Sequence, residues 1–142
     1  MNKGKFYRDT YSAITPESYD SIHPRCGIYH GSHKCREGYV YVARGDGGAV
    51  KIGHTSSVAA LRHRMYENRR VYGMGFTLLF MLRTHCARGL EAKIHKALEV
   101  CRDTNAGGDE LFRPDDQQLS WVSRIDSFVR QPVVLVPAIE LL

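Results

Sequence analysis

Alternating apolar and polar positions in the middle of the chain predict a short antiparallel hairpin. Residues 39–43 alternate, so that Val40 and Val42 share one face of a strand while two tyrosines share the other. The glycine-rich residues 44–48 then predict a turn, and residues 49–53 predict the returning strand. We therefore expect a hairpin whose two faces differ in chemistry.

Helical spacing and one unbroken apolar run predict the remaining elements. They are a helix after a serine cap at Ser56 or Ser57, a central strand at residues 76–83, a helix from about residue 88 to 100, a short strand at residues 110–112, a helix beginning at Asp115 or Asp116, and an edge strand at residues 133–137. The last helix is expected to bury Leu119, Val122, Ile125 and Val129. This order predicts an α/β sandwich with a small, mostly antiparallel central sheet flanked by helices.

The 142 residues divide into three expected parts. Residues 1–37 are polar and broken by prolines and glycines, which indicates an N-terminal arm or accessory segment. Residues 38–130 form the expected main domain, and residues 131–142 form an edge strand and tail. No apolar run is long enough to span a membrane and no secretory signal is visible, so we expect a cytoplasmic protein.

The lack of a visible export signal also bears on the state of the cysteines. Without an export signal, the four cysteines are expected to be thiols or metal ligands and not disulfides. Two of them take part in a C-x3-H-x2-H-x-C pattern, formed by Cys26, His30, His33 and Cys35. Such ligands suit Zn²⁺, but the spacing differs from the common zinc-finger classes, so we favour the interpretation without zinc.

Positive charge is concentrated near one part of the chain. The net charge is +5, and residues 51–88 hold seven Lys or Arg against a single acid, Glu67. Clustered basic charge favours a polyanionic partner, because phosphate contacts supply most of the non-specific affinity for nucleic acid. A solvated helix face explains the same charge equally well.

Three side chains on different predicted elements supply the groups that phosphodiester cleavage needs. Tyr41 on the first strand offers a phenol for proton transfer, Arg62 on the next helix offers a guanidinium for phosphate, and Glu91 on the following helix offers a carboxylate for a divalent metal. Taken singly, each has a structural explanation: a packed strand aromatic, a helix surface cation and a salt-bridged acid.

The spacing of these residues resembles that of the GIY-YIG nuclease superfamily. The similar elements are the Gly-Tyr-Val-Tyr-Val strand at residues 38–42, the Lys-Ile-Gly strand end at residues 51–53, an arginine nine residues after that glycine, Glu91, and Gly-Asp-Glu-Leu-Phe at residues 108–112. The closest resemblance is to the phage-associated branch whose second motif reads KIG. The literal Gly27-Ile28-Tyr29 lies too far before Lys51 and is interpreted as coincidence.

The resemblance implies roles for the strand residues. Tyr41 would position or deprotonate the attacking water. Lys51 stands where most of the superfamily has a second tyrosine, so it would instead contact phosphate, or act as a base if burial lowers its pKa. His54 would be a general base or a phosphate donor, and a solvated turn histidine is an equal alternative.

The resemblance also implies roles for the helix residues. Arg62 would stabilise the transition state, and Glu91 would hold Mg²⁺ or Mn²⁺. Tyr66 would be a second phenol near the metal, with a half-buried helix tyrosine as the even alternative. His95 would protonate the leaving oxygen or orient Glu91, and Asn105 matches an asparagine of many relatives. Basic side chains around them would grip the duplex, namely Arg64, Arg69 and Arg70.

The leading hypothesis is therefore a Mg²⁺- or Mn²⁺-dependent endonuclease acting on double-stranded DNA, in the bacterial cytoplasm if the chain is phage-encoded. One site per chain leaves a homodimer open for double-strand cleavage. The first alternative is a catalytically inactive nucleic-acid-binding module, which Lys51 in the tyrosine position favours. The second is a phage accessory protein that binds a host protein.

Overall fold

An antiparallel hairpin of β1 (Gly38–Gly45) and β2 (Val50–Thr55) forms the centre of the fold, as expected from the alternation. The computed structural model describes residues 36–104, 111–129 and 132–138. β1 is longer than the predicted 39–43 at both ends, and β2 is shifted from the predicted 49–53 toward its C-terminal end. The turn between them is one residue shorter than predicted. The Gly45 amide donates to the Ala49 carbonyl at 2.8 Å and closes this turn.

The hairpin belongs to a five-stranded sheet in the order β4-β2-β1-β3-β5. The other strands are β3 (Phe76–Thr84), β4 (Leu111–Phe112) and β5 (Val133–Pro137). Every pairing in this sheet is antiparallel. The predicted fold class, an α/β sandwich with a small antiparallel sheet, is confirmed.

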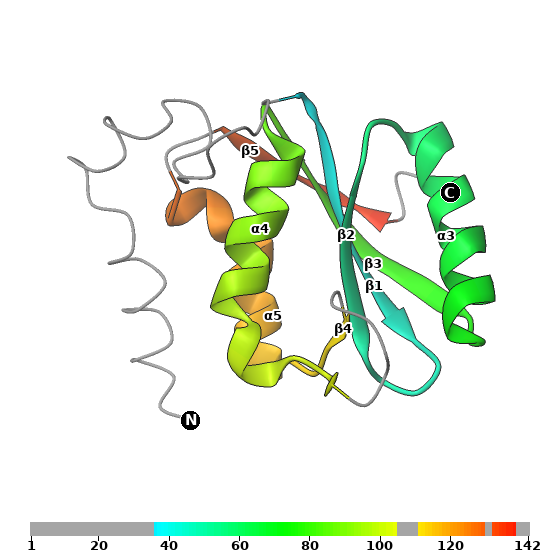
Figure 1. Cartoon of the computed structure of the whole chain (residues 1–142). Helices are drawn as coiled ribbons and strands as arrows, with labels where there is room; N and C mark the ends of the chain where they lie inside the picture. The colour runs from blue at the N-terminus through cyan, green and yellow to red at the C-terminus, as the bar shows by residue number, and fades with distance from the viewer. Residues whose placement is uncertain (1–35, 105–110, 130–131, 139–142) are drawn as a thin grey trace.

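Helices cover both faces of the sheet, as Figure 1 shows. Helices α4 (Ala87–Ala97) and α5 (Asp116–Ser123) pack on the face that carries Val40 and Val42. Helix α3 (Val58–Tyr72) covers the opposite face, where Tyr41 packs with Leu61. The expected division of β1 into a valine face and a tyrosine face is therefore confirmed.

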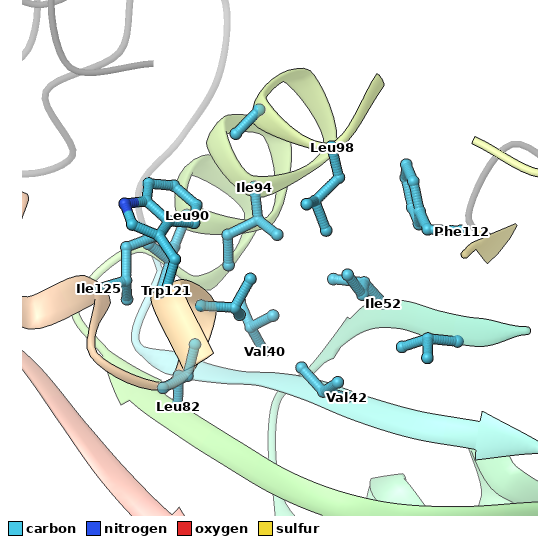
Figure 2. Close-up of a cluster of buried hydrophobic side chains, with 13 residues drawn as sticks. Val40, Val42, Ile52, Leu82, Leu90, Ile94, Leu98, Phe112, Trp121 and Ile125 are labelled. Atoms are coloured by element: carbon cyan, nitrogen blue, oxygen red, sulfur yellow. The ribbon is translucent and has the colours of Figure 1, made fainter. Parts of the chain in front are cut away.

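The larger core cluster lies between the sheet and the helices α4 and α5. Figure 2 shows its side chains converging from the two layers. Its largest fully buried members include Trp121, Phe112, Ile52, Leu90 and Ile94. Burial of this many large apolar groups, at roughly 1.5–3 kcal/mol each, fixes α4 firmly against β2. This packing matters for the site because α4 also carries Glu91.

Helix α3 begins and ends at residues that its sequence specifies. Ser57 is its N-cap, and its hydroxyl accepts from the Ala60 amide at 3.0 Å. Gly73 ends it with a left-handed backbone, φ 68°, which glycine adopts without steric cost. The cap at Ser57 fixes where α3 begins, and the packing of Leu61 sets which of its residues face the sheet.

The third predicted helix is shorter than expected. Asp115 caps α5 in a reciprocal capping box with Gln118, which buries that glutamine. The helix ends at Ser123, and the 3₁₀ turn η3 (Ile125–Ser127) follows. Because the chain turns early, Leu119 and Val129 are only half-buried, and Trp121 is the dominant buried side chain in their place.

Several sequence predictions lie outside the described residues. They are the arm before residue 36 with Cys26, His30, His33 and Cys35, the Gly27-Ile28-Tyr29 sequence, Asn105, and the first three residues of the 108–112 segment. Within the described ranges, Cys86 and Cys101 form no disulfide. No helix in these ranges is both long and apolar enough to cross a membrane.

Candidate functional site

The Tyr41 phenol is held between the sheet and α3 by two neighbours. Gly53 lies opposite Tyr41 in the β1–β2 register, and its bare Cα leaves room for the ring. From α3, Asn68 Nδ2 donates to the Tyr41 oxygen at 3.2 Å. Burial raises the pKa of the Tyr41 phenol, partly opposed by this hydrogen bond and by the charge of Arg64. The phenol therefore keeps its proton at neutral pH, which suits a positioning role better than that of a general base.

Lys51 lies on the same face of the sheet and is almost fully buried, with 5% of its surface exposed. Its ammonium lies over the Tyr72 ring, 5.7 Å from the ring centroid. Burial lowers the pKa of Lys51 to about 8; the negative charge of Glu91 raises the pKa and the positive charge of Arg64 lowers it. Lys51 is thus a cation at neutral pH that loses its charge under mildly alkaline conditions.

Arg64 is the arginine of α3 that belongs to this group. Its charge acts on the pKa values of both Tyr41 and Lys51, and it lines a cleft together with His54. Arg62, which the spacing had singled out, is exposed and does not line that cleft. The reason is helical geometry: two residues correspond to a rotation of about 200°, so Arg62 and Arg64 leave the helix on nearly opposite sides.

Tyr66 shares the side of α3 that carries Arg62. It is 62% exposed and is not among the residues that line the cleft. The phenol that does approach the group is Tyr72, whose ring lies beside Lys51. Arg69 and Arg70, in the last turn of α3, are exposed and also lie outside the cleft lining. Of the side chains predicted to form the site, His54 and Arg64 line the cleft, whereas Arg62 and Tyr66 do not.

Glu91 and His54 meet directly. His54 Nδ1 contacts Glu91 Oε2, so a histidine at the end of β2 is joined to the first turns of α4. Glu91 is 8% exposed, whereas His54 remains partly exposed and lines the cleft. A carboxylate that accepts from Nδ1–H fixes the tautomer of the ring and leaves Nε2 as a proton acceptor. Chemically, such a pair can act as an oriented base.

His95 lies one turn after Glu91 but has a different partner. Its Nε2 donates to the Ile52 carbonyl at 2.7 Å, while Glu91 Oε1 is 3.7 Å from the same nitrogen, beyond hydrogen-bond reach. Burial lowers the pKa of His95, so the ring is neutral at pH 7. Phe112 packs against the ring, with centroids 5.1 Å apart. His95 therefore ties α4 to β2 through its hydrogen bond to the Ile52 carbonyl.

A cleft of about 570 Å³ opens between the starts of α3 and α4. His54, Ser56, Ala60 and Arg64 line one part of it, and Ala87 and Arg88 from the first turn of α4 line another. Its volume is typical of a site for a small ligand or one unit of a polymer. The oriented histidine and the site arginine thus face one shared space.

The donor set fits a hard divalent cation held by a single carboxylate. Among the described residues, no group of three or more His, Cys, Asp or Glu side chains is arranged to enclose a metal. Mg²⁺ is commonly held by one or two carboxylates, with water and substrate phosphate completing its shell. Glu91 offers Oε1 for this purpose, since His54 takes Oε2 and His95 donates elsewhere.

Sequence reasoning missed two members of the group. Asn68 and Tyr72 were not singled out, although they follow Leu61 at helical intervals of seven and eleven residues and so share its face. A polar asparagine on the stripe of a buried leucine is the signal that could have identified Asn68. Arg64 was predicted only as a duplex-binding residue, because the motif spacing from Gly53 points to Arg62.

Fold and site together define a small α/β sandwich domain with a cationic cleft beside a buried Tyr-Lys-Glu group. Residues 38–131, about two thirds of the chain, match the T5orf172 domain. The chain therefore belongs to the T5orf172 domain family. Comparison with curated proteins and with solved structures found no match.

Proposed function

We propose that this protein is a metal-dependent DNA endonuclease of the GIY-YIG type, which hydrolyses phosphodiester bonds. The observation that carries the proposal is the Glu91–His54 contact at a cleft shared with Arg64. An oriented base, a guanidinium and a carboxylate for a metal are the groups that phosphodiester hydrolysis requires. Membership of the T5orf172 family and the resemblance to the KIG branch support the same class.

In this proposal Arg64 and Lys51 supply positive charge to the phosphate. The Arg64 guanidinium can bind two phosphate oxygens side by side, a geometry that lysine cannot reproduce. Lys51 is held by burial and by the Tyr72 ring. Its ammonium therefore needs to move little as negative charge develops on the phosphate oxygens. In this proposal the Lys51 ammonium takes the place of the second tyrosine of the superfamily.

His54 receives the proton from the attacking water. As water forms its new bond to phosphorus, its proton passes to His54 Nε2, the bond from phosphorus to the leaving oxygen breaks, and that oxygen takes a proton from solvent. Glu91 Oε2 orients the ring and stabilises the imidazolium that forms. Tyr41 keeps its proton and serves to position the phosphate or the water, because its raised pKa disfavours the phenolate.

Glu91 would also hold the metal through Oε1. Bound Mg²⁺ or Mn²⁺ would supply Lewis-acid stabilisation of negative charge on the phosphate oxygens. The partner is double-stranded DNA, to which the exposed Arg69 and Arg70 add non-specific affinity.

The test is relaxation of supercoiled plasmid in Mg²⁺, Mn²⁺ or EDTA, with matched arginine variants of α3. Arg64→Ala and Arg62→Ala remove the same charge from the same helix, two residues apart. We expect Arg64→Ala to lower the nicking rate by about 10²-fold or more, the usual effect of removing a transition-state donor. Arg62→Ala should lose no more than the few-fold expected from one screened surface charge.

Glu91→Gln provides the second variant, because it keeps the shape of the side chain and removes its charge. It should abolish metal-dependent nicking while leaving DNA binding in EDTA intact. Equal activity of Glu91→Gln and the parent protein would refute the proposal. Binding without any metal-dependent cleavage by the parent would favour the inactive binding module.

A further inference from the structure

The cleft is larger than the reacting groups require. His54 and Arg64 account for part of its lining, but it continues to Arg36, just before β1, and to Arg88, in the first turn of α4. Neither of these arginines enters the proposed chemistry. Both belong to the rim opposite α3, so the cleft presents cations on two walls.

Charge in this cleft is strongly one-sided. Three arginines line it against one acid, Glu37, and Glu37 is already paired with Arg83 at 3.2 Å. The first turns of α3 and α4 lie within the described residues, and neither carries an acidic side chain. The positive ends of both helix dipoles therefore add to the arginine charge and are not neutralised locally.

The backbone of the rim opposite α3 is close-packed. The Ala87 amide donates to the Arg36 carbonyl at 3.2 Å and joins the start of α4 to the chain that enters β1. Gly38 lies directly below: a Cβ at this position would stand 2.7 Å from the Thr55 carbonyl oxygen and 3.3 Å from Ala87 Cβ. The close approach of these segments therefore depends on a glycine.

We propose that Arg36 and Arg88 form a second phosphate subsite, which binds the phosphate next to the scissile one on the same strand. Arg64 meets the scissile phosphate, and the two arginines across the cleft meet its neighbour. The inference rests on the proposed function for the role of Arg64. The subsite fixes how the strand lies in the cleft and makes the substrate a chain with at least two consecutive phosphates.

The first test uses a probe with two phosphates at backbone spacing, thymidine 3′,5′-bisphosphate, compared with thymidine 5′-monophosphate. Binding to the full chain is measured by calorimetry in EDTA, so that no cleavage is needed. We expect the parent protein to bind the bisphosphate about tenfold more tightly, the effect of one further charge-assisted contact. The Arg36→Ala/Arg88→Ala variant should lose this preference.

A matched control removes the same charge elsewhere. Arg44 and Arg124 are exposed and lie outside the cleft lining, so Arg44→Ala/Arg124→Ala should keep the tenfold preference. The subsite is refuted if the parent binds both nucleotides equally, or if Arg36→Ala/Arg88→Ala keeps the preference. Far-ultraviolet circular dichroism of each variant confirms that folding is unchanged.

A second measurement asks whether the subsite serves DNA or only free nucleotides. The affinity for a fluorescent 16-base-pair duplex is followed from 50 to 200 mM KCl in EDTA. Arg36→Ala/Arg88→Ala should lose one phosphate contact, which makes the slope of log K against log salt shallower by about 0.9. The slope of Arg44→Ala/Arg124→Ala should not change. An unchanged slope in both variants would overturn the strand assignment.

The two proposals fail separately. A bisphosphate preference that depends on Arg36 and Arg88, without plasmid nicking, would remove the nuclease and keep the subsite. Nicking that depends on Glu91, without the preference, would remove the subsite and keep the nuclease.

Discussion

Gly53 lies so close to the Tyr41 phenol that a Cβ at Gly53 would stand 2.5 Å from the Tyr41 oxygen. The two residues face each other across the hairpin, in register and on the α3 face of the sheet. The glycine of the Lys-Ile-Gly motif is therefore explained by the tyrosine of the preceding strand. The backbone of Gly53 requires no special conformation, since the positive φ values belong to Gly48 and Gly73.

Gly53→Ala should displace the phenol and break its hydrogen bond to Asn68. We expect a loss of about 1–3 kcal/mol in the free energy of unfolding, the usual cost of overpacking. Urea unfolding measures this loss. Gly47→Ala is the control, because the added Cβ meets nothing within 4 Å and φ is not positive. It should change stability by no more than about 0.5 kcal/mol. Equal effects of the two substitutions would contradict the steric argument.

The hydrogen bond from Asn68 to Tyr41 should appear as a coupling energy. In a double-mutant cycle of Tyr41→Phe and Asn68→Ala, we expect about 0.5–1.5 kcal/mol of coupling in urea unfolding, because neither group retains its partner after a single change. The cycle of Tyr39→Phe with Asn68→Ala controls for phenol removal on the same strand face and should give coupling near zero. Equal coupling in both cycles would show that the hydrogen bond from Asn68 to Tyr41 contributes no coupling energy of its own.

Strand alternation and capping were enough to predict most of the fold. The period of two in β1 separates Val40 from Tyr41, and each does lie in the core of its own face. Ser57 begins α3, and β5 occupies the predicted residues 133–137 at the sheet edge. These features are local, because they follow from a few neighbouring residues and need no knowledge of what packs against them.

Which helix residues share the cleft is harder to predict from sequence, because it depends on the rotation of the helix. Counting nine residues from Gly53 selects Arg62, but the face that α3 presents is set by the packing of Leu61 against the sheet. A change of two positions reverses the direction of a side chain on a helix, whereas it leaves a strand residue on the same face. Strand alternation therefore placed Tyr41 on the α3 face, whereas the motif spacing did not reveal that Arg64, and not Arg62, lines the cleft.

Lys51 gives the stability of the protein a defined pH dependence. Burial lowers its pKa from 10.5 to about 8, so between these values the unfolded chain binds more protons than the folded chain. Stability therefore rises with pH in this window. From pH 7.5 to 9.5 the parent should gain up to about 2 kcal/mol over Lys51→Met in urea unfolding. A constant difference between the two proteins would show that the Lys51 pKa is not lowered.

The same titration should appear in activity and separate two roles of Lys51. If its charge stabilises the phosphate, nicking in Mg²⁺ falls as pH rises through about 8, and Lys51→Arg removes this fall because arginine stays charged. A rate that rises through the same range and is abolished by Lys51→Arg would make Lys51 the base and displace His54. Lys93 is the control, since burial also lowers its pKa to about 8; Lys93→Arg should leave the profile unchanged.

His95 should make the protein sensitive to mild acid. Burial lowers the pKa of its ring in the folded state, so the unfolded chain, with a pKa near 6.5, binds a proton first as the pH falls. Stability contributed by neutral His95 is therefore complete above about pH 6.5 and is lost below it.

His95→Gln can still donate to the Ile52 carbonyl but cannot titrate, whereas His95→Phe leaves that carbonyl without its donor. Urea unfolding between pH 5 and 7.5 should show a smaller pH dependence for His95→Gln than for the parent. At pH 7, His95→Phe should lose about 1–3 kcal/mol through the unsatisfied carbonyl. A parent and a His95→Gln variant with parallel pH curves would show that His95 is as easily protonated in the fold as in the unfolded chain.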